Sequence, residues 1–393
     1  MNISLPIIAG YARTPFVRFC GAFASLSAVD LGSRAIAAAL DRAGVSADEV
    51  DLVVGGQVLQ AGAGQNPIRQ SAVAAGIPLT TPALTVNAVC LSGTLAVAQA
   101  AHAIARGEAR VVVAVGQESM SSAPHVQRGS RLGTRYGAIE LVDSLAHDGL
   151  TDAFEERSMG ASTEDFNGPF QLTRVQQDAW AARSHTAAAA EADLLAEEIV
   201  PVAVPSRRGE PTVVMHDDGV RPDTTTESLA RLRPAFSSTG TITAGNSSQI
   251  SDGAAAIVLV APIHPSAARP GAVRVLSTAF VAGPDVSLHR QPAQAIAAAL
   301  DPTGRAASEV SIVEINEAFA AVAVESVRTL GVDQDRVNRA GGAIALGHPI
   351  GASGTRIVGT LARQLASLES GAAGAAGICG GGGQGAAVVL ERV

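Results

Sequence analysis

The sequence contains no lysine, and its 28 basic residues are all arginine. Schiff-base enzymes, pyridoxal phosphate enzymes and P-loop ATPases each need a lysine amine, so these classes are excluded. The 36 acidic residues leave a net charge of −8, and no basic stripe runs along the chain. Nucleic acid is therefore not expected as a partner.

Cysteine is scarce, with only Cys20, Cys90 and Cys379 in the chain. Their odd number and wide spacing argue against a disulfide framework or a cysteine-rich zinc site. The longest apolar run, residues 254–263, is too short to span a bilayer, and the first residues lack the pattern of a secretory signal. We expect a cytoplasmic protein with reduced thiols and no membrane insertion.

Charged residues make up only 16% of the sequence, whereas 47% of residues are hydrophobic and 41 are glycine. At about 100–200 residues per domain, the 393 residues correspond to two or three domains or one large double domain. Glycines without a collagen-like period predict tight turns and close backbone contacts.

An internal repeat organises the chain. Residues 35–56 read AIAAALDRAGVSADEVDLVVGG and residues 295–316 read AIAAALDPTGRAASEVSIVEIN, so that 12 of 22 positions are identical at an offset of 260 residues. Each copy reads as an alanine-rich helix followed by a strand. The repeat predicts one α/β unit used twice, not a short solenoid.

The segments after the two copies are also alike, since each continues through a glycine-bounded turn into a helix and then a strand. This alternation predicts parallel sheets covered by helices, with active sites at the carboxyl ends of strands. The duplication places Cys90 and His348 at related points, where they can face each other across a pseudo-twofold axis. The predicted domains are an N-terminal half (1–117, completed by about 245–268), an insertion loop domain (118–244) and a C-terminal half (269–393). Residues 174–195 read as an amphipathic surface helix.

Four motifs carry residues suited to chemistry. Cys90 lies in NAVCLSG at a strand-to-helix turn, where a helix N-terminus favours thiolate; the alternative for Cys90 alone is a small buried hydrophobic residue. Asn316 lies in NEAFA, His348 in GGAIALGHPIGASG, and Cys379 in CGGGGQG. Glycine runs of the last kind can present backbone N–H groups to an oxyanion.

Together the motifs resemble the thiolase family over nearly the whole chain, since residues 232–236 and 243–248 also look like family segments. The second cysteine separates thiolases from ketoacyl synthases. The resemblance implies an α/β thiolase fold, with two duplicated α/β halves layered α-β-α-β-α plus the insertion loop domain.

The resemblance also implies catalytic roles. Cys90 would attack a carbonyl and carry the acyl group, and His348 would help form its thiolate. With a water held by Asn316, His348 would stabilise the enolate oxygen. Cys379 would be the acid/base at the α-carbon, and the N–H groups of Cys90 and Gly381 would form a second oxyanion hole. Claisen chemistry needs such a nucleophile, a separate base and stabilisation of two oxyanions.

Substrate contacts follow from the same resemblance. It implies acyl-CoA partners and no metal or other cofactor. The residues it assigns to the substrate and CoA, from the adenine end to the acyl group, are Arg221, Ser228, Phe236, Ala244, Ser248, Met159, Ala318 and Phe319.

The resemblance implies condensation of two acetyl-CoA to acetoacetyl-CoA plus CoA, with a broad-range 3-ketoacyl-CoA thiolase of fatty-acid β-oxidation as the alternative. Ser158 and residues 283–292 depart from the family pattern near the acyl site. Two rivals are a non-catalytic thiolase-like carrier or scaffold, which predicts loss of a catalytic residue, and an acyl binder that uses CoA only as a ligand. A homotetramer or homodimer is expected.

Overall fold

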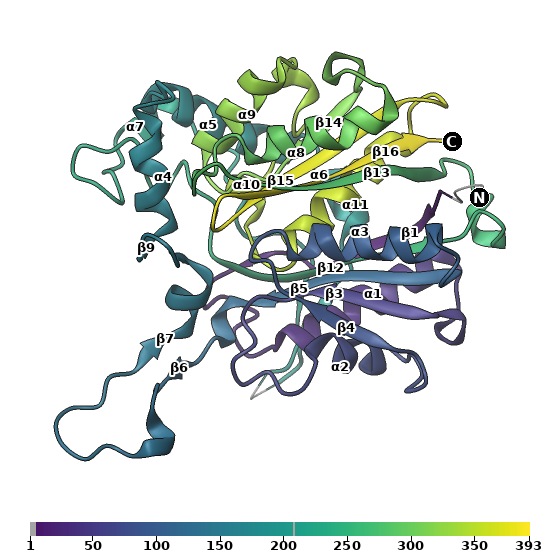
Figure 1. Cartoon of the computed structure of the whole chain (residues 1–393), viewed down its shortest axis with the longest axis horizontal. Coiled ribbons are helices and arrows are strands. Elements are labelled where there is room, and N and C mark those ends of the chain that lie inside the picture. Colours follow the sequence, from purple (N-terminus) through teal and green to yellow (C-terminus); the bar gives the residue numbers. More distant parts are fainter. Residues whose placement is uncertain (1–4, 207–208) are drawn as a thin grey trace.

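The computed structural model describes residues 5–206 and 209–393, and the same set of elements occurs in each half (Figure 1). The first half contains β1 (Ile7–Arg13), α1 (Ala28–Ala43), β3 (Leu52–Gly56), α3 (Ser92–Ala105), β5 (Val111–Ser119) and β12 (Ser251–Val260). The second half contains β13 (Val273–Ala282), α8 (Gln291–Leu300), β14 (Ile312–Ile315), α11 (Ser353–Ala366), β15 (Ala373–Gly380) and β16 (Gln384–Arg392). The predicted duplication of one α/β unit is therefore confirmed.

The strands of the two halves follow one order, β3-β5-β12-β1 and β14-β15-β16-β13. Only the pairs β3–β5 and β14–β15 are parallel within these orders, and the other neighbours are antiparallel. The expectation of parallel sheets is thus wrong in part. Alternation of helix and strand was misleading here because a tight glycine turn folds β15 and β16 into a hairpin, whose strands must be antiparallel.

Additional elements extend this duplicated frame. β2 (Val17–Arg18) pairs with β12, while β4 (Ala83–Val86) lies parallel to β3 at the edge of the sheet. β1 and β13 pair over two residues and so connect the two halves. The remaining helices of the halves are α2 (Pro67–Ala74), α9 (Ala320–Leu330) and α10 (Ala343–Leu346).

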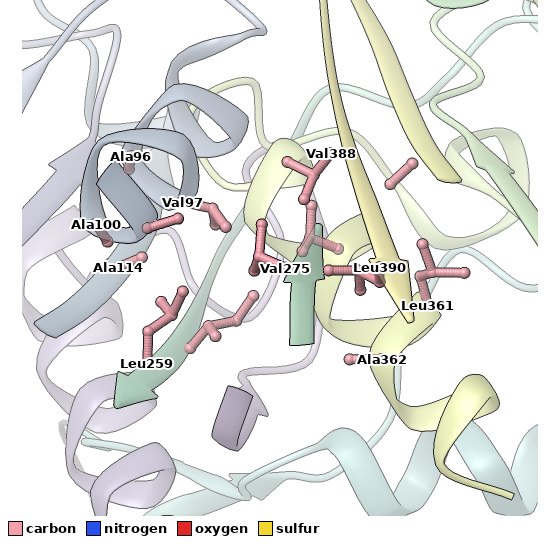
Figure 2. Close-up of a cluster of buried hydrophobic side chains, with 14 of the residues drawn as sticks. Ala96, Val97, Ala100, Ala114, Leu259, Val275, Leu361, Ala362, Val388 and Leu390 are labelled. Atoms are coloured by element: carbon pink, nitrogen blue, oxygen red, sulfur yellow. The ribbon is translucent and has the colours of Figure 1, made fainter. Parts of the chain in front are cut away.

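The layers run helix, sheet, helix, sheet, helix, with α3 and α11 between the two sheets (Figure 1). Small residues on these helices let both sheets close over them. Figure 2 shows part of this shared core, in which Ala96, Val97 and Ala100 of α3 lie near Val275 and Val388 of the second sheet. A Cβ on Gly93 would lie 2.6 Å from Thr355 N, and one on Gly354 would lie 2.4 Å from Thr94 N. Glycine at both positions therefore allows the two helices to cross in direct backbone contact.

The insertion between β5 and β12 consists of short elements and three longer helices. Its elements are β6 (His125–Val126), β7 (Val142–Asp143), a π-helical turn (Leu145–Gly149), β8 (Thr151–Asp152), β9 (Arg157–Ser158), α4 (Met159–Asn167), α5 (Arg174–Ala190), α6 (Ala192–Glu198), β10 (Val202–Val204), β11 (Thr212–Val214) and α7 (Thr226–Ala230). The loop between β6 and β7 projects from the body of the molecule (Figure 1). Within residues 5–206 and 209–393, no helix is both long and apolar enough to cross a membrane. The bounds of the three predicted domains stay a prediction.

The helix expected over 174–195 is two helices, α5 and α6, and the buried face of α5 carries polar as well as apolar side chains. Asp178 and Ser184 are buried there beside Trp180. Asn246 Nδ2 donates to Asp178 at 2.9 Å, while Ser184 Oγ and Trp180 Nε1 donate to Glu317 at 2.7 and 2.9 Å. α5 thus has one exposed and one buried face, as expected of a surface helix, but its buried face also hydrogen-bonds to the loop that follows β14.

Candidate active site

The turn that carries Cys90 is strained. Val89 has φ 52°, a left-handed conformation that is costly for a β-branched residue, of order 1–3 kcal/mol. Side chains fasten the turn: Val89 N donates to Asn87 Oδ1 at 3.0 Å, and Ser92 Oγ accepts from Ala88 N at 2.9 Å and donates to Val89 O at 2.5 Å. This turn holds the partly buried Cys90 just before α3.

The same turn occurs in the second half. Residues 90–94 read CLSGT and residues 351–355 read GASGT, and each sequence begins one of the two crossing helices. Gly351 is therefore the counterpart of Cys90, and His348 is the counterpart of Asn87. Cys90 and His348 were expected at related points of the two halves, and they occupy nearby but different positions of the repeated turn. Only the first half has a cysteine at the position shared by Cys90 and Gly351.

His348 is buried and its hydrogen bonds fix its tautomer. Ser353 Oγ donates to Pro349 O at 3.0 Å, so that its lone pair accepts from His348 Nδ1 at 2.6 Å. Nε2 is left as an acceptor, 3.5 Å from Asn316 Nδ2. Burial lowers the pKa of His348 to about 3, and Arg356 contributes in the same direction. The imidazole is therefore neutral, and its Nε2 can accept a hydrogen bond in the site.

Asn316 lies at the carboxyl end of β14 and is fully buried. Its backbone N–H donates to Gly377 O at 3.0 Å, which joins it to the neighbouring strand β15. Its side-chain Oδ1 has no hydrogen-bond partner among residues 5–206 and 209–393. A buried amide oxygen of this kind can accept from a ligand or a water.

Cys379 is buried and Cys90 is partly buried, and the two thiols lie close enough for their charges to interact. Burial raises the pKa of Cys379, and a charge on Cys90 raises it further. Burial likewise raises the pKa of Cys90 to about 12, opposed by its own backbone N–H and reinforced by Glu118. Burial thus opposes the effect expected of the helix N-terminus on Cys90, and the predicted Cys90 thiolate stays a prediction.

Gly381 lies in the turn between β15 and β16, directly against the Cys90 turn. A Cβ on Gly381 would lie 3.6 Å from both Met159 Sδ and a Val89 methyl, and one on Gly380 would lie 2.8 Å from Leu91 Cγ. The backbone after Cys379 therefore packs on the residues that flank Cys90. The predicted role of the Gly381 N–H in an oxyanion hole stays a prediction.

Most of the predicted acyl-site residues also gather beside Cys379. Met159, Ala318 and Phe319 belong to one apolar cluster with Cys379. Phe236 packs edge-on against Phe319, with ring centroids 6.2 Å apart and planes at 87°. Ser248 N donates to Ala318 O at 3.0 Å, and Ala244 lies exposed four residues earlier in the same segment. The structure thus brings six of the eight predicted substrate residues to one region.

The other two predicted CoA residues lie in the outer part of the insertion. Arg221 is exposed, and its backbone N–H donates to His185 Nδ1 at 3.2 Å. Ser228 is exposed on α7, and its hydroxyl donates to Thr225 O at 2.8 Å. Their described hydrogen bonds are therefore local to the insertion, and their assignment to the adenine end of CoA stays a prediction.

Two family models match nearly the whole chain. The chain matches the family model "Thiolase, N-terminal domain" over residues 6–262 and "Thiolase, C-terminal domain" over residues 270–392. It belongs to the thiolase family. As a thiolase it is an enzyme of the acyltransferase class.

Similar proteins cover this thiolase almost end to end. A probable acetyl-CoA acetyltransferase of Mycolicibacterium smegmatis is 51% identical over 98% of this chain and 100% of its own, and an acetyl-CoA acetyltransferase of Pseudomonas aeruginosa is 44% identical over 98% and 99%. The crystal structure of the Bacillus anthracis acetyl-CoA acetyltransferase has a TM-score of 0.93 at 34% identity, covering 100% of this chain and 99% of that one. Acat5 thiolase from Ascaris suum, solved in complex with coenzyme A, has a TM-score of 0.90 at 38% identity, covering 99% and 100%.

Sequence reasoning missed three residues that support the thiolase site. Ser353 orients His348, and its signal was the SGT shared with the Cys90 turn. Glu317 is buried and accepts hydrogen bonds from Trp180, Ser184, Asn338 and the Ile344 backbone, which fixes the loop after Asn316. Glu118 accepts from the backbone of both halves. No motif in the sequence predicts the contacts of Glu317 or of Glu118, because these contacts join segments that are far apart in the chain.

Proposed function

We propose that this thiolase catalyses the reversible Claisen condensation of two acetyl-CoA to acetoacetyl-CoA plus CoA, through an acetyl group on Cys90. The observation that carries the proposal is the meeting of two thiols, one from each half: partly buried Cys90 and buried Cys379. A neutral, buried His348 supports it, because its Nε2 is an acceptor that lies 3.5 Å from Asn316 Nδ2. The names of the relatives support acetyl-CoA as the substrate.

The first half-reaction acylates Cys90. Its sulfur attacks the thioester carbonyl while His348 Nε2 takes the thiol proton. The carbon–sulfur bond to CoA then breaks, and Cys379 gives its proton to the departing CoA sulfur. The resting thiol and imidazole suit this sequence, because the charge on sulfur passes at once to the thioester oxygen.

The oxyanion of this step is assigned to the backbone N–H groups of Cys90 and Gly381. The repeated turn supports the assignment of Cys90: the N–H of its counterpart Gly351 donates to a carboxylate oxygen of Glu118 at 3.0 Å. A turn with this sequence and position in the fold thus binds an anionic oxygen.

The second half-reaction forms the carbon–carbon bond. The Cys379 thiolate takes an α-proton from a second acetyl-CoA and becomes a thiol again. The enolate oxygen accepts hydrogen bonds from protonated His348 Nε2 and from a water held by Asn316 Oδ1. The enolate carbon then attacks the acetyl carbonyl, the bond to Cys90 breaks, and His348 returns its proton to the Cys90 sulfur. Thiolysis is the same path reversed.

The acyl pocket supports a short-chain substrate over the broad-range alternative. Leu288, from one of the segments that depart from the family pattern, is buried in the same cluster as Phe319 and Cys379. Ser158, the other departure, accepts from Ala161 N at 3.3 Å as the cap of α4. Leu288 therefore adds to the packing beside Cys379, while Ser158 fixes the start of the helix that begins with Met159.

We expect the kcat/KM of thiolysis to fall from C4 to C8 to C12 3-ketoacyl-CoA under one set of conditions. Overpacking a closed pocket costs roughly 1–3 kcal/mol, whereas a pocket open to longer chains would gain about 0.8 kcal/mol per methylene. A value that rises with chain length would favour the β-oxidation alternative and leave Cys90 as the acylated residue.

The remaining parts of the proposal concern partners and location. We propose that Arg221, Ser228, Phe236, Ala244 and Ser248 contact CoA, and that no metal or further cofactor takes part. A homotetramer or homodimer is supported by the projecting β6–β7 loop, whose exposed apolar side chains are Leu132, Tyr136, Ile139 and Leu141. The three free cysteines are compatible with the proposed cytoplasmic location.

A further inference from the structure

Glu118 is a fully buried carboxylate at the carboxyl end of β5. Its Oε2 accepts from Val58 N and from Gly351 N, each at 3.0 Å, and its Oε1 accepts from Leu59 N at 3.1 Å. Two of these donors belong to the first half and one to the second. The carboxylate therefore joins the halves through backbone N–H groups, and no ion pair to it is found in the part of the chain that the structure describes.

The three donors belong to the walls of the Cys90 site. Val58, Leu59 and Ile350 form an apolar cluster against which Cys90 packs. Glu118 binds the backbone of the first two directly and that of Ile350 through the next residue, Gly351. The same carboxylate thus fixes the surfaces on either side of the sulfur.

The space around Gly351 is closed by this arrangement. A Cβ at that position would lie 2.7 Å from Glu118 Oε2 and 2.6 Å from Gln117 O. In the Cys90 turn the equivalent position carries the thiol. The second half has no nucleophile at this position. There, a carboxylate oxygen of Glu118 accepts from the backbone N–H of Gly351, the residue equivalent to Cys90.

We propose that Glu118 is a positioning residue for acyl transfer, whose carboxylate holds the walls of the Cys90 site and the turn after His348 in their reactive arrangement. This inference rests on the proposed acetylation of Cys90. Glu118 acts through Val58, Leu59 and Gly351 and does not itself take part in the bond changes.

Glu118→Gln tests the proposal with little change in volume. An amide oxygen can accept from two of the three N–H groups, but the amide nitrogen is a donor and would face the third one. A misplacement of about 1 Å near reacting atoms can cost about 10²-fold in rate. We therefore expect the rate of Cys90 acetylation by acetyl-CoA, and kcat for thiolysis, to fall roughly 10- to 100-fold while KM changes little.

The control is Glu391→Gln, which also removes a buried carboxylate. Glu391 pairs with Arg274 and Arg305 near the end of β16, at the opposite end of that strand from the Cys379 turn. Thermal unfolding of both variants reports any general loss of stability. We expect the control to keep wild-type acetylation even where its melting temperature falls as far as that of Glu118→Gln.

The pH dependence of acetylation gives a readout that a purely structural role would not change. Burial raises the pKa of Glu118 to about 7, reinforced by Asp252 and opposed by the three N–H groups. Protonation converts one acceptor into a donor, so wild-type acetylation should fall as pH drops through about 7. Of the other groups, burial lowers the pKa of His348 to about 3 and raises the pKa values of Cys90 and Cys379 well above 7. Burial also raises the pKa of Glu314, two residues before Asn316, to about 7, so the pH profile is measured in Glu314→Gln as well, which should keep the midpoint. Glu118→Gln should lose this midpoint.

Two results overturn the inference: acetylation of Cys90 at the wild-type rate in Glu118→Gln, or retention of the midpoint near pH 7 in that variant. Failure of the proposed function looks different, since the wild-type protein itself would then show no acetyl group on Cys90.

Discussion

Cys379→Ala should still become acetylated on Cys90 but should fail to exchange the α-protons of acetyl-CoA with solvent. The sulfur of Cys379 is the only group that we assign to the α-carbon, and loss of a positioned acid/base costs on the order of 10²–10⁴ in rate. Incubation in deuterated buffer followed by mass spectrometry of the recovered acetyl-CoA measures the exchange. Acetylation should also be slower, because the departing CoA sulfur loses its proton donor.

Cys20→Ala is the matched control for this variant. Cys20 is free and exposed, and its backbone N–H donates to Ser121 Oγ at 2.8 Å. That variant should exchange and acetylate as the wild-type protein does. Normal α-proton exchange in Cys379→Ala would remove Cys379 from the role of base.

His348→Ala should slow both half-reactions. Neutral Nε2 accepts the Cys90 proton in the first half-reaction, and protonated Nε2 stabilises the enolate in the second, so each step should lose roughly 10²–10⁴ in rate. Rapid-quench measurement of Cys90 acetylation and deuterium exchange of acetyl-CoA monitor the two steps separately. His125→Ala, at an exposed histidine of the β6 strand, is the control.

The pattern across the two assays identifies the role of His348. Wild-type acetylation in His348→Ala would contradict its part in activating Cys90. Slow acetylation with unchanged exchange would confine the histidine to the first half-reaction and leave the enolate to Asn316 and its water.

Much of the fold follows from sequence because the duplication is visible in it. Twelve identities in 22 residues predict two copies of one α/β unit, and the structure contains the same strand order twice. Strand direction does not follow from the helix–strand alternation. The hairpin from β15 to β16 depends on the turn at residues 381–383, where Gly382 and Gly383 have positive φ.

The meeting of Cys90 and Cys379 was predictable from the resemblance of their motifs to those of the thiolase family. Their protonation states were not, since burial in the folded protein dominates both cysteine pKa values and the pKa of His348. Periodicity also did not predict that α5 turns Asp178 and Ser184 inward beside the apolar Trp180 and Ala181, because it assumes an apolar interior.

The supporting carboxylates lay beyond sequence reasoning for a related reason. Glu118 contacts Gly351 across 233 residues of chain, and Glu317 contacts Trp180 across 137. The sequence around a buried Glu in a strand or loop contains no pattern that predicts such distant partners. Only the folded backbone shows which N–H groups converge on it.

The location of the acetyl group tests the central claim most directly. Wild-type protein is incubated with acetyl-CoA, quenched in acid, digested and mapped by peptide mass spectrometry. We predict one acetyl group on the peptide that contains Cys90, and none on that peptide in Cys90→Ala. An acetyl group found reproducibly on Cys379 and never on Cys90 would contradict the account.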